Sequence, residues 1–175
     1  MTITATAPFA SLDHARALLD AAPMPAVAAA VVTREGLALE YHRGVADLRT
    51  MEALTPAHAF DLASLTKVLV TLPEVLALVE AGRVSVNDRV RLHLPEAGWM
   101  TTGTGLGDVT VAQLLSHTSG LPAWAPLYTH PADRDTLVAR VLQTPLERAP
   151  GERTVYSDLG FVVLGALVER VTGRG

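Results

Sequence analysis

The sequence has no cysteine, few aromatic residues and only one lysine. Without cysteine it can form no disulfide, no thiolate metal site and no cysteine nucleophile. Aromatic residues make up 5% of the 175 residues, so a core would be built mainly from Ala, Val and Leu. Hydrophobic residues reach 49%, which argues against disorder, and the length fits a single domain.

Other absences exclude further classes of protein. The net charge is −4 and there is no run of basic residues, so we expect no nucleic-acid partner. Residues Met1–Pro8 lack the features of a signal peptide, and the longest apolar run, Met24–Val32, is too short to cross a bilayer. We therefore expect a cytoplasmic protein with no membrane contact. The six histidines are scattered and Gly103–Gly107 lacks the spacing of a dinucleotide loop, so we expect no metal or cofactor.

The single lysine is Lys67, whereas the other thirteen of the fourteen basic residues are arginine. Arginine keeps its proton at every accessible pH, but a desolvated lysine can lose it. A residue that served only as a surface charge would be arginine, judging by the rest of the chain. The exception therefore marks Lys67 as a candidate for proton transfer.

Hydrophobic periodicity predicts an α+β protein that begins with a helix and a hairpin and continues mainly as helices. The expected helices are Ser11–Ala22, Ser64–Ala81, Val111–Ser116, Asp133–Leu142 and Leu159–Val171. The expected strands are Ala26–Thr33 and Leu37–Arg43. We expect one domain, with the helix and hairpin in residues 1–63 and the mainly helical region in residues 64–175. Pro73 should kink or loosen the helix that contains it.

The first pattern that could carry chemistry is Ser64-Leu65-Thr66-Lys67. In the first turn of a helix, residues three apart share a face, so the Ser64 hydroxyl and the Lys67 amine can meet. Serine becomes a nucleophile when a nearby base takes its proton, and a desolvated lysine can be that base. The helix start also offers backbone N–H groups to an oxyanion. The alternative is an ordinary serine beside a solvated lysine, because the bare pattern is common.

The second pattern, Tyr156-Ser157-Asp158, lies on a predicted loop just before the last helix. A tyrosine beside a lysine ammonium loses its proton more readily, and it can then relay a proton to a leaving group. The alternative is a loop tyrosine that packs against the core.

In this order, the two patterns resemble those of serine β-lactamases and penicillin-binding proteins. Ser64-x-x-Lys67 is similar to their nucleophile motif. Tyr156-x-Asp158 is similar to the Tyr-x-Asn motif of the class C branch, which includes carboxylesterases and D-aminopeptidases. Other stretches of the chain also resemble this branch of the family, at Leu114–Leu121, at Val79–Gly82 with Asp88, at Pro150-Gly151 and at Gly165–Gly173. The resemblance runs from about Ala26 to the last residue and covers the amino-terminal part of the family's domain.

The resemblance implies a β-lactamase/transpeptidase-like fold and a serine hydrolase that forms an acyl-enzyme. In that scheme Ser64 is acylated, Lys67 deprotonates it and Tyr156 shuttles a proton. Asp158 would contact the substrate. His117 and Ser119 could be taken for a serine–histidine pair, but the resemblance makes their loop structural.

The chain departs from the family pattern in two places. Asp158 stands where the family has Asn, and its charge disfavours a β-lactam that carries a carboxylate. The third motif, Lys or His followed by Ser/Thr and Gly, is missing, since Val171-Thr172-Gly173 lacks the cation. We therefore expect a fragment without the later sheet strands. The missing carboxy-terminal half or a second copy could pair with its open sheet edge.

The leading hypothesis is a hydrolase of small esters or amides, of the esterase or D-amino-acid peptidase type. β-Lactams are a second candidate substrate class. The alternative is a non-catalytic or inactive truncated member that binds acyl or peptidoglycan-like ligands. Covalent labelling by a fluorophosphonate separates these classes, because only a reactive serine takes the label.

Overall fold

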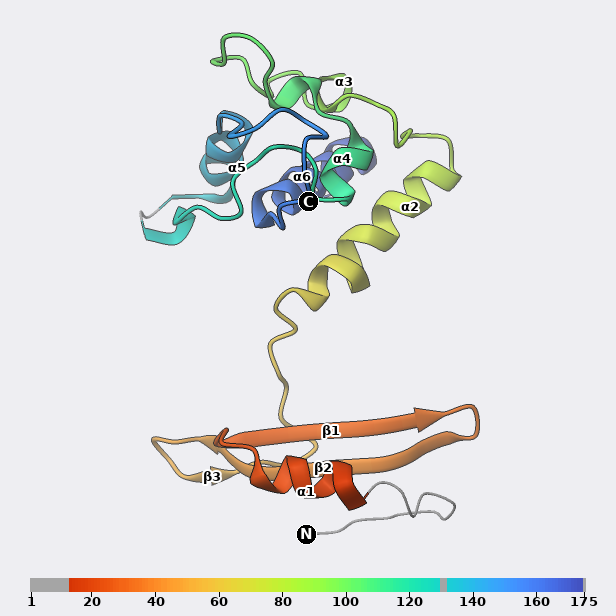
Figure 1. Cartoon of the computed structure of the whole chain (residues 1–175), viewed down its shortest axis with the longest axis vertical. Coiled ribbons are helices and arrows are strands. Elements are labelled where there is room, and N and C mark those ends of the chain that lie inside the picture. Colours follow the sequence, from red (N-terminus) through yellow and green to blue (C-terminus); the bar gives the residue numbers. More distant parts are fainter. Residues whose placement is uncertain (1–12, 130–131, 175) are drawn as a thin grey trace. The chain divides into compact units, whose positions relative to one another are not determined.

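A computed structural model describes residues 13–129 and 132–174, and the chain divides into two compact units, one ending at Asp61 and one beginning at Leu62 (Figure 1). The elements of the first unit are the helix α1 Asp13–Ala21 and the strands β1 Ala26–Thr33, β2 Gly36–Asp47 and β3 Glu52–Ala53.

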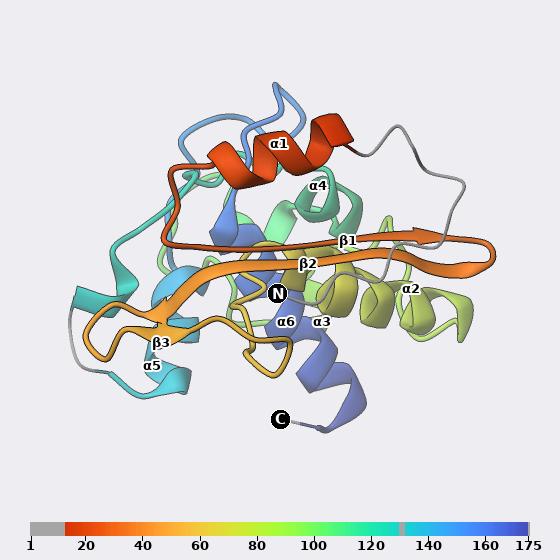
Figure 2. The same cartoon turned by 90° about the horizontal axis from the view of Figure 1, so that it is seen from below.

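The first unit is a helix beside a three-stranded antiparallel sheet in the order β1-β2-β3. The predicted strand over residues 26–33 is confirmed, and its register runs from Ala26 opposite Gly44 to Thr33 opposite Gly36. The second strand extends beyond its predicted end at Arg43 because its far end pairs with β3. The Arg43 guanidinium donates to the carbonyl oxygens of Leu19 and Ala22 and so links α1 to β2. Figure 2 shows α1 alongside the hairpin of β1 and β2.

In its described part, the second unit contains helices and no strand, only an isolated bridge between Arg89 and Thr110. This agrees with the expectation that no strand follows Ser64. Its elements are η2 Lys67–Thr71, α2 Leu72–Glu80, α3 Val90–His93, η3 Leu106–Asp108, α4 Val111–Leu115, η4 Leu127–Thr129, α5 Arg134–Leu142 and α6 Asp158–Thr172.

The helix after Ser64 departs from regular α-helix next to Pro73, as the sequence predicted. Helical structure begins at Leu65, and residues 67–71 form a π-helical turn in which the Leu72 N–H donates to the Lys67 carbonyl oxygen. This i→i−5 spacing gives a wider turn directly before Pro73, which has no N–H to donate. The helix ends as predicted near Gly82, whose φ is +66° and whose N–H donates to the Val79 carbonyl oxygen.

The core of the second unit surrounds α6, which packs against α2, α4 and α5. Ser157 caps the start of α6 by accepting the Gly160 N–H, and Gly173 ends it with φ +72°. The fully buried side chains around it include Val75, Leu114, Val141, Leu159, Val163, Leu164 and Leu167. Burial of each leucine side chain stabilises the folded state by about 1.5–3 kcal/mol, so this packing fixes the position of α6.

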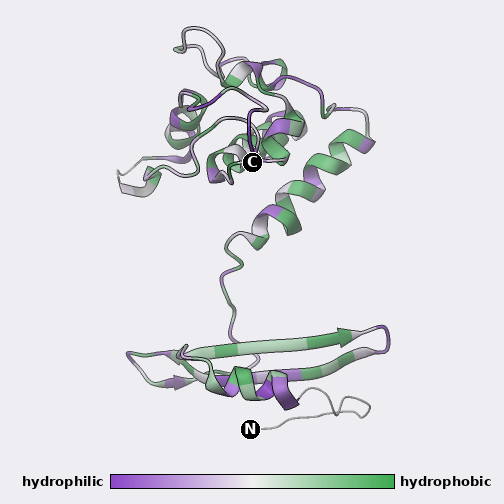
Figure 3. Ribbon diagram, viewed as in Figure 1, coloured by the Kyte–Doolittle hydropathy of each residue, from purple (hydrophilic) through white to green (hydrophobic). Residues whose placement is uncertain are grey.

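The helix formed by η2 and α2 is apolar along most of its length (Figure 3). Only Val75 and Leu78 are buried, whereas Leu65, Val68 and Leu69 are each about half exposed. Across residues 13–129 and 132–174, no helix is both long enough and apolar enough to cross a membrane.

Candidate active site

Ser64 lies in the turn that opens the helix, and its side chain is exposed. The preceding residue, Ala63, has a left-handed backbone with φ +45°. This conformation is uncommon for a residue with a Cβ and costs of order 1–3 kcal/mol. The Ser64 hydroxyl oxygen accepts two hydrogen bonds, one from Lys67 Nζ at 3.1 Å and one from Tyr156 Oη at 2.8 Å. The two residue patterns predicted from the sequence therefore meet at one oxygen atom.

Lys67 is enclosed, with its side chain only 14% exposed. Besides Ser64, its ammonium donates to Asp158 Oδ1 at 2.6 Å. Two aromatic rings complete its surroundings, because Nζ lies 5.0 Å from the Tyr156 ring centroid and 5.8 Å from that of Phe161. The Lys67 side chain thus joins Ser64 to Asp158, the first residue of α6.

Tyr156 stands on a segment that is paired with a second loop. Four backbone N–H groups of the first segment donate to four carbonyl oxygens of the second, in the pairs Glu147–Gly120, Gly151–Thr118, Val155–His117 and Asp158–Ala123. The two loops approach so closely that a Cβ on Gly120 would lie 2.2 Å from the Arg148 carbonyl oxygen. Gly120 also has φ +84°, so only glycine fits there. This pairing holds Tyr156 above the start of α6.

The loop that carries His117 and Ser119 makes mainly structural contacts. Ser119 is buried, and its hydroxyl accepts the Leu121 N–H at 3.3 Å. His117 Nδ1 accepts the Ser157 N–H at 3.0 Å. Burial argues against Ser119 as a nucleophile, whereas Ser64 is exposed and hydrogen-bonded to Lys67 and Tyr156.

The pKa values of the two groups around Ser64 are shifted in opposite directions. Burial lowers the pKa of the Lys67 ammonium, but its hydrogen bonds and charge interactions with Asp158 and Tyr156 outweigh burial and raise the pKa above 10.5. Hydrogen bonds with Ser64 and then with Lys67 lower the pKa of the Tyr156 phenol below 10.0, although burial and the Asp158 charge oppose them. Lys67 therefore holds its proton more tightly than a free lysine does, and Tyr156 releases its proton more easily than a free tyrosine.

Sequence reasoning did not identify Phe161, which lies against both Lys67 and His117. The available signal was its spacing, since Phe161 is three residues after Asp158 and so shares a face of α6 with it. Asp158 was expected to face the substrate. The structure adds a contact with Lys67 that the sequence did not indicate.

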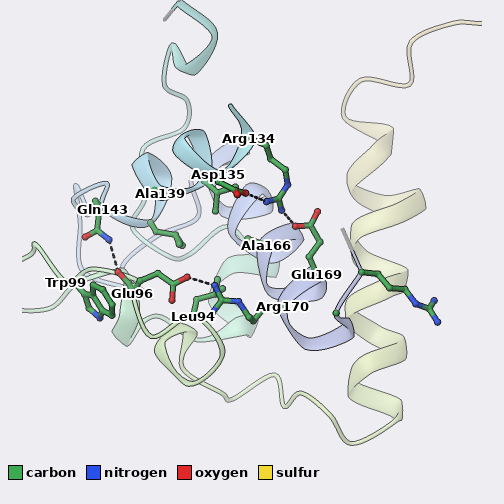
Figure 4. A pocket seen from close by; sticks show the side chains of 14 residues that line it. Leu94, Glu96, Trp99, Arg134, Asp135, Ala139, Gln143, Ala166, Glu169 and Arg170 are labelled. Atoms are coloured by element: carbon green, nitrogen blue, oxygen red, sulfur yellow. Dashed lines mark hydrogen bonds and ion pairs between the residues drawn. The ribbon is translucent and has the colours of Figure 1, made fainter. Parts of the chain in front are cut away.

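A cavity of about 700 Å³ lies away from Ser64, between α5, α6 and the loop around Trp99 (Figure 4). Most of its charged groups are paired with each other, as in the ion pairs of Arg170 with Glu96 and of Arg134 with Glu169. Leu142 and Ala166 contribute apolar walls. It contains no nucleophile beside a base, so the cluster around Ser64 remains the better candidate for chemistry.

Comparison with known proteins gives a consistent result. The sequence matches the Beta-lactamase family over residues 13–175. An N-acetylmuramyl-L-alanine amidase of Bacillus subtilis (strain 168) is 33% identical over 126 residues, which are 66% of this chain and 28% of that protein. A protein of Escherichia coli (strain K12) assigned as a D-alanyl-D-alanine carboxypeptidase is 31% identical over 149 residues, which are 79% of this chain and 34% of that protein.

The fold is shared with a solved class C beta-lactamase mutant. The TM-score is 0.74 at 23% identity, over 94% of this chain and 43% of that chain. The predicted β-lactamase/transpeptidase-like fold is thereby confirmed. The chain spans about a third of the length of the curated relatives named above.

Proposed function

The chain belongs to the beta-lactamase family, and we propose that it is a serine hydrolase in which Ser64 forms an acyl-enzyme. The observation that carries this proposal is the meeting of Lys67 Nζ and Tyr156 Oη at the Ser64 hydroxyl oxygen. Tyr156 comes from a segment 92 residues further along the chain. A serine within hydrogen-bond reach of two proton-transfer groups is the arrangement that nucleophilic catalysis needs.

The opposite pKa shifts divide the roles between Lys67 and Tyr156 in this proposal. The Tyr156 phenol first gives its proton to solvent, and the phenolate then accepts the Ser64 proton while Ser64 Oγ bonds to the substrate carbonyl carbon. When the tetrahedral intermediate collapses, the neutral Tyr156 gives that proton to the leaving group. Lys67 stays an ammonium, held by Asp158, and its charge stabilises the phenolate. Water then attacks the acyl carbonyl carbon while the Tyr156 phenolate accepts a proton from that water. Tyr156 passes the proton to Ser64 Oγ as the bond between Ser64 and the acyl group breaks, which frees Ser64.

This division differs from the role that the sequence resemblance implied for Lys67. There, Lys67 itself deprotonates Ser64. The hydrogen bond to Asp158 Oδ1 favours the charged lysine and so opposes that role.

We further propose that the substrates are small amides or esters, with peptides containing D-amino acids as the favoured class. The names of the relatives support this, since one is an amidase and the other is assigned as a D-alanyl-D-alanine carboxypeptidase. The charge of Asp158, which is 46% exposed next to the nucleophile, disfavours substrates with a carboxylate at that place.

Treatment with a fluorophosphonate is expected to label Ser64 and no other residue. The reagent needs a reactive hydroxyl rather than complete turnover, so it tests the nucleophile in the chain as it stands. Mass spectrometry of the digested protein locates the label, and Ser64→Ala is the control that should take none. A label on Ser119 or Ser157, or no label at all, would remove the basis of the proposal and favour a ligand-binding role.

Asp158→Asn is expected to raise the hydrolysis of nitrocefin relative to that of p-nitrophenyl butyrate. The change removes a negative charge beside an anionic substrate, and the ratio cancels general effects on Ser64. Because Asp158 is partly exposed, we expect roughly a fivefold change, the scale of about 1 kcal/mol for a screened pair. Glu152→Gln removes a charge from the same loop and serves as the matched control. An unchanged ratio would mean that Asp158 does not face the substrate.

A further inference from the structure

His117 contacts the chain on both sides of Tyr156. Its carbonyl oxygen accepts the Val155 N–H at 2.8 Å, and its Nδ1 accepts the Ser157 N–H at 3.0 Å. Its ring also packs against the phenol, with the two centroids 4.5 Å apart and the planes tilted by 38°. His117 thus contacts the residue before Tyr156, the residue after it and the Tyr156 ring itself.

The geometry requires a particular form of the imidazole. A ring nitrogen that accepts a backbone N–H carries no proton, so in the neutral ring the proton lies on Nε2. Burial and then the positive charge of Lys67 lower the pKa of His117 below 6.5, against the charge of Asp158. His117 is therefore a neutral acceptor at neutral pH.

The backbone of His117 is also unusual. Its φ is +58°, in the left-handed region that residues other than glycine adopt uncommonly. The Phe161 ring lies on the imidazole as well, with centroids 5.2 Å apart. The carbonyl oxygen and the imidazole thus reach the same short segment, and Phe161 adds a second ring contact. Any residue at this position could supply the carbonyl oxygen, but the second acceptor and the ring contact come from the histidine side chain.

We propose that His117 is a positioning residue for Tyr156, and this inference rests on the proposed function of Ser64 as the nucleophile. The imidazole fixes the segment from Val155 to Ser157 and the plane of the phenol. The Tyr156 hydroxyl then points at Ser64 Oγ. His117 does not touch the reacting atoms itself, and it acts through Tyr156.

Two variants separate the parts of this role. His117→Ala removes both the acceptor and the ring. His117→Asn keeps an acceptor, because Asn Oδ1 replaces Nδ1 at the same distance from the backbone, and Asn tolerates the left-handed conformation. We expect fluorophosphonate labelling of Ser64 to slow on the order of tenfold to a hundredfold in His117→Ala, the scale for a misplaced reacting group, and to recover in large part in His117→Asn.

The decisive readout is the pKa of the Tyr156 phenol, which is followed by phenolate absorbance without any substrate. Tyr156→Phe identifies its share of the signal beside Tyr41 and Tyr128. His117→Ala should move this pKa up toward 10.0, and His117→Asn should leave it lowered. A purely structural role would reduce stability without this shift. An unshifted Tyr156 in folded His117→Ala would overturn the proposal.

A measurement on the unmodified protein covers the case in which His117→Ala fails to fold. Nitrogen-15 NMR should find Nδ1 of His117 unprotonated and Nε2 protonated, with slow hydrogen exchange at the Ser157 amide. A proton on Nδ1 would exclude the hydrogen bond and the proposal with it. Neither readout needs Ser64 to react. If Ser64 takes no label while the phenol pKa behaves as expected, the hydrolase proposal fails and the positioning role stands.

Discussion

Replacing Tyr156 with phenylalanine is expected to slow acylation of Ser64 by roughly a hundredfold or more, the usual scale for a lost general base. The change removes one oxygen atom, the one that lies 2.8 Å from Ser64 Oγ. It keeps the ring, so the contacts with His117 and with the Lys67 ammonium remain. The loss therefore measures proton transfer rather than packing.

The dependence of the labelling rate on pH tests whether the Tyr156 phenolate is the base. The phenolate is the form that accepts a proton, so the labelling rate should rise with pH through the pKa of Tyr156. Since that pKa is lowered, the rise should occur below pH 10.0, and it should be absent in Tyr156→Phe. Tyr41→Phe, which removes a hydroxyl bonded to Asp20 in the first unit, is the matched control. Retention of most of the rate by Tyr156→Phe would show that another group takes the Ser64 proton.

The second large effect is expected at Lys67, where two substitutions distinguish a charge from a base. Lys67→Ala should also slow labelling by about a hundredfold, because it removes an electrostatic group next to developing negative charge. If Lys67 acts as an ammonium, Lys67→Arg should keep more of the rate than Lys67→Ala, by about tenfold, since arginine retains the charge.

The pKa of Tyr156 supplies an independent check on the Lys67 variants. Interactions with Lys67 lower this pKa, so Lys67→Ala should raise it, and Lys67→Arg should largely preserve the lowered value. If arginine and alanine were equally damaging while the phenol pKa stayed low in Lys67→Arg, the lysine would have to lose its proton during the reaction. That result would restore the role that the sequence resemblance implied.

Local features of the chain could be predicted from the sequence with good precision. The strand over residues 26–33 has a clear apolar pattern, and the helices predicted over residues 133–142 and 159–171 are observed as α5 and α6 with bounds that differ by at most one residue. The proximity of Ser64 and Lys67 follows from helical spacing alone. Two short elements, β3 and α3, were not predicted because two to four residues are too few to show a period.

Long-range features of the site could not be obtained in the same way. The place of Tyr156 beside Ser64 came from family resemblance, because no local pattern links residues so far apart. The ion pair between Lys67 and Asp158 was missed, and with it the direction of the Lys67 pKa shift. The spacing of Leu65, Val68 and Leu69 fits a helix, yet it did not indicate that these side chains are half exposed.

The enclosed ammonium of Lys67 has a consequence for proteolysis. Lys67 is the only lysine of the chain, so a lysine-specific protease has a single peptide bond to cut, directly after residue 67. In the folded protein this side chain is engaged by Ser64 and Asp158 and cannot enter a protease pocket. Cleavage requires the helix start to open, so its rate reports how often Lys67 separates from Ser64 and Asp158.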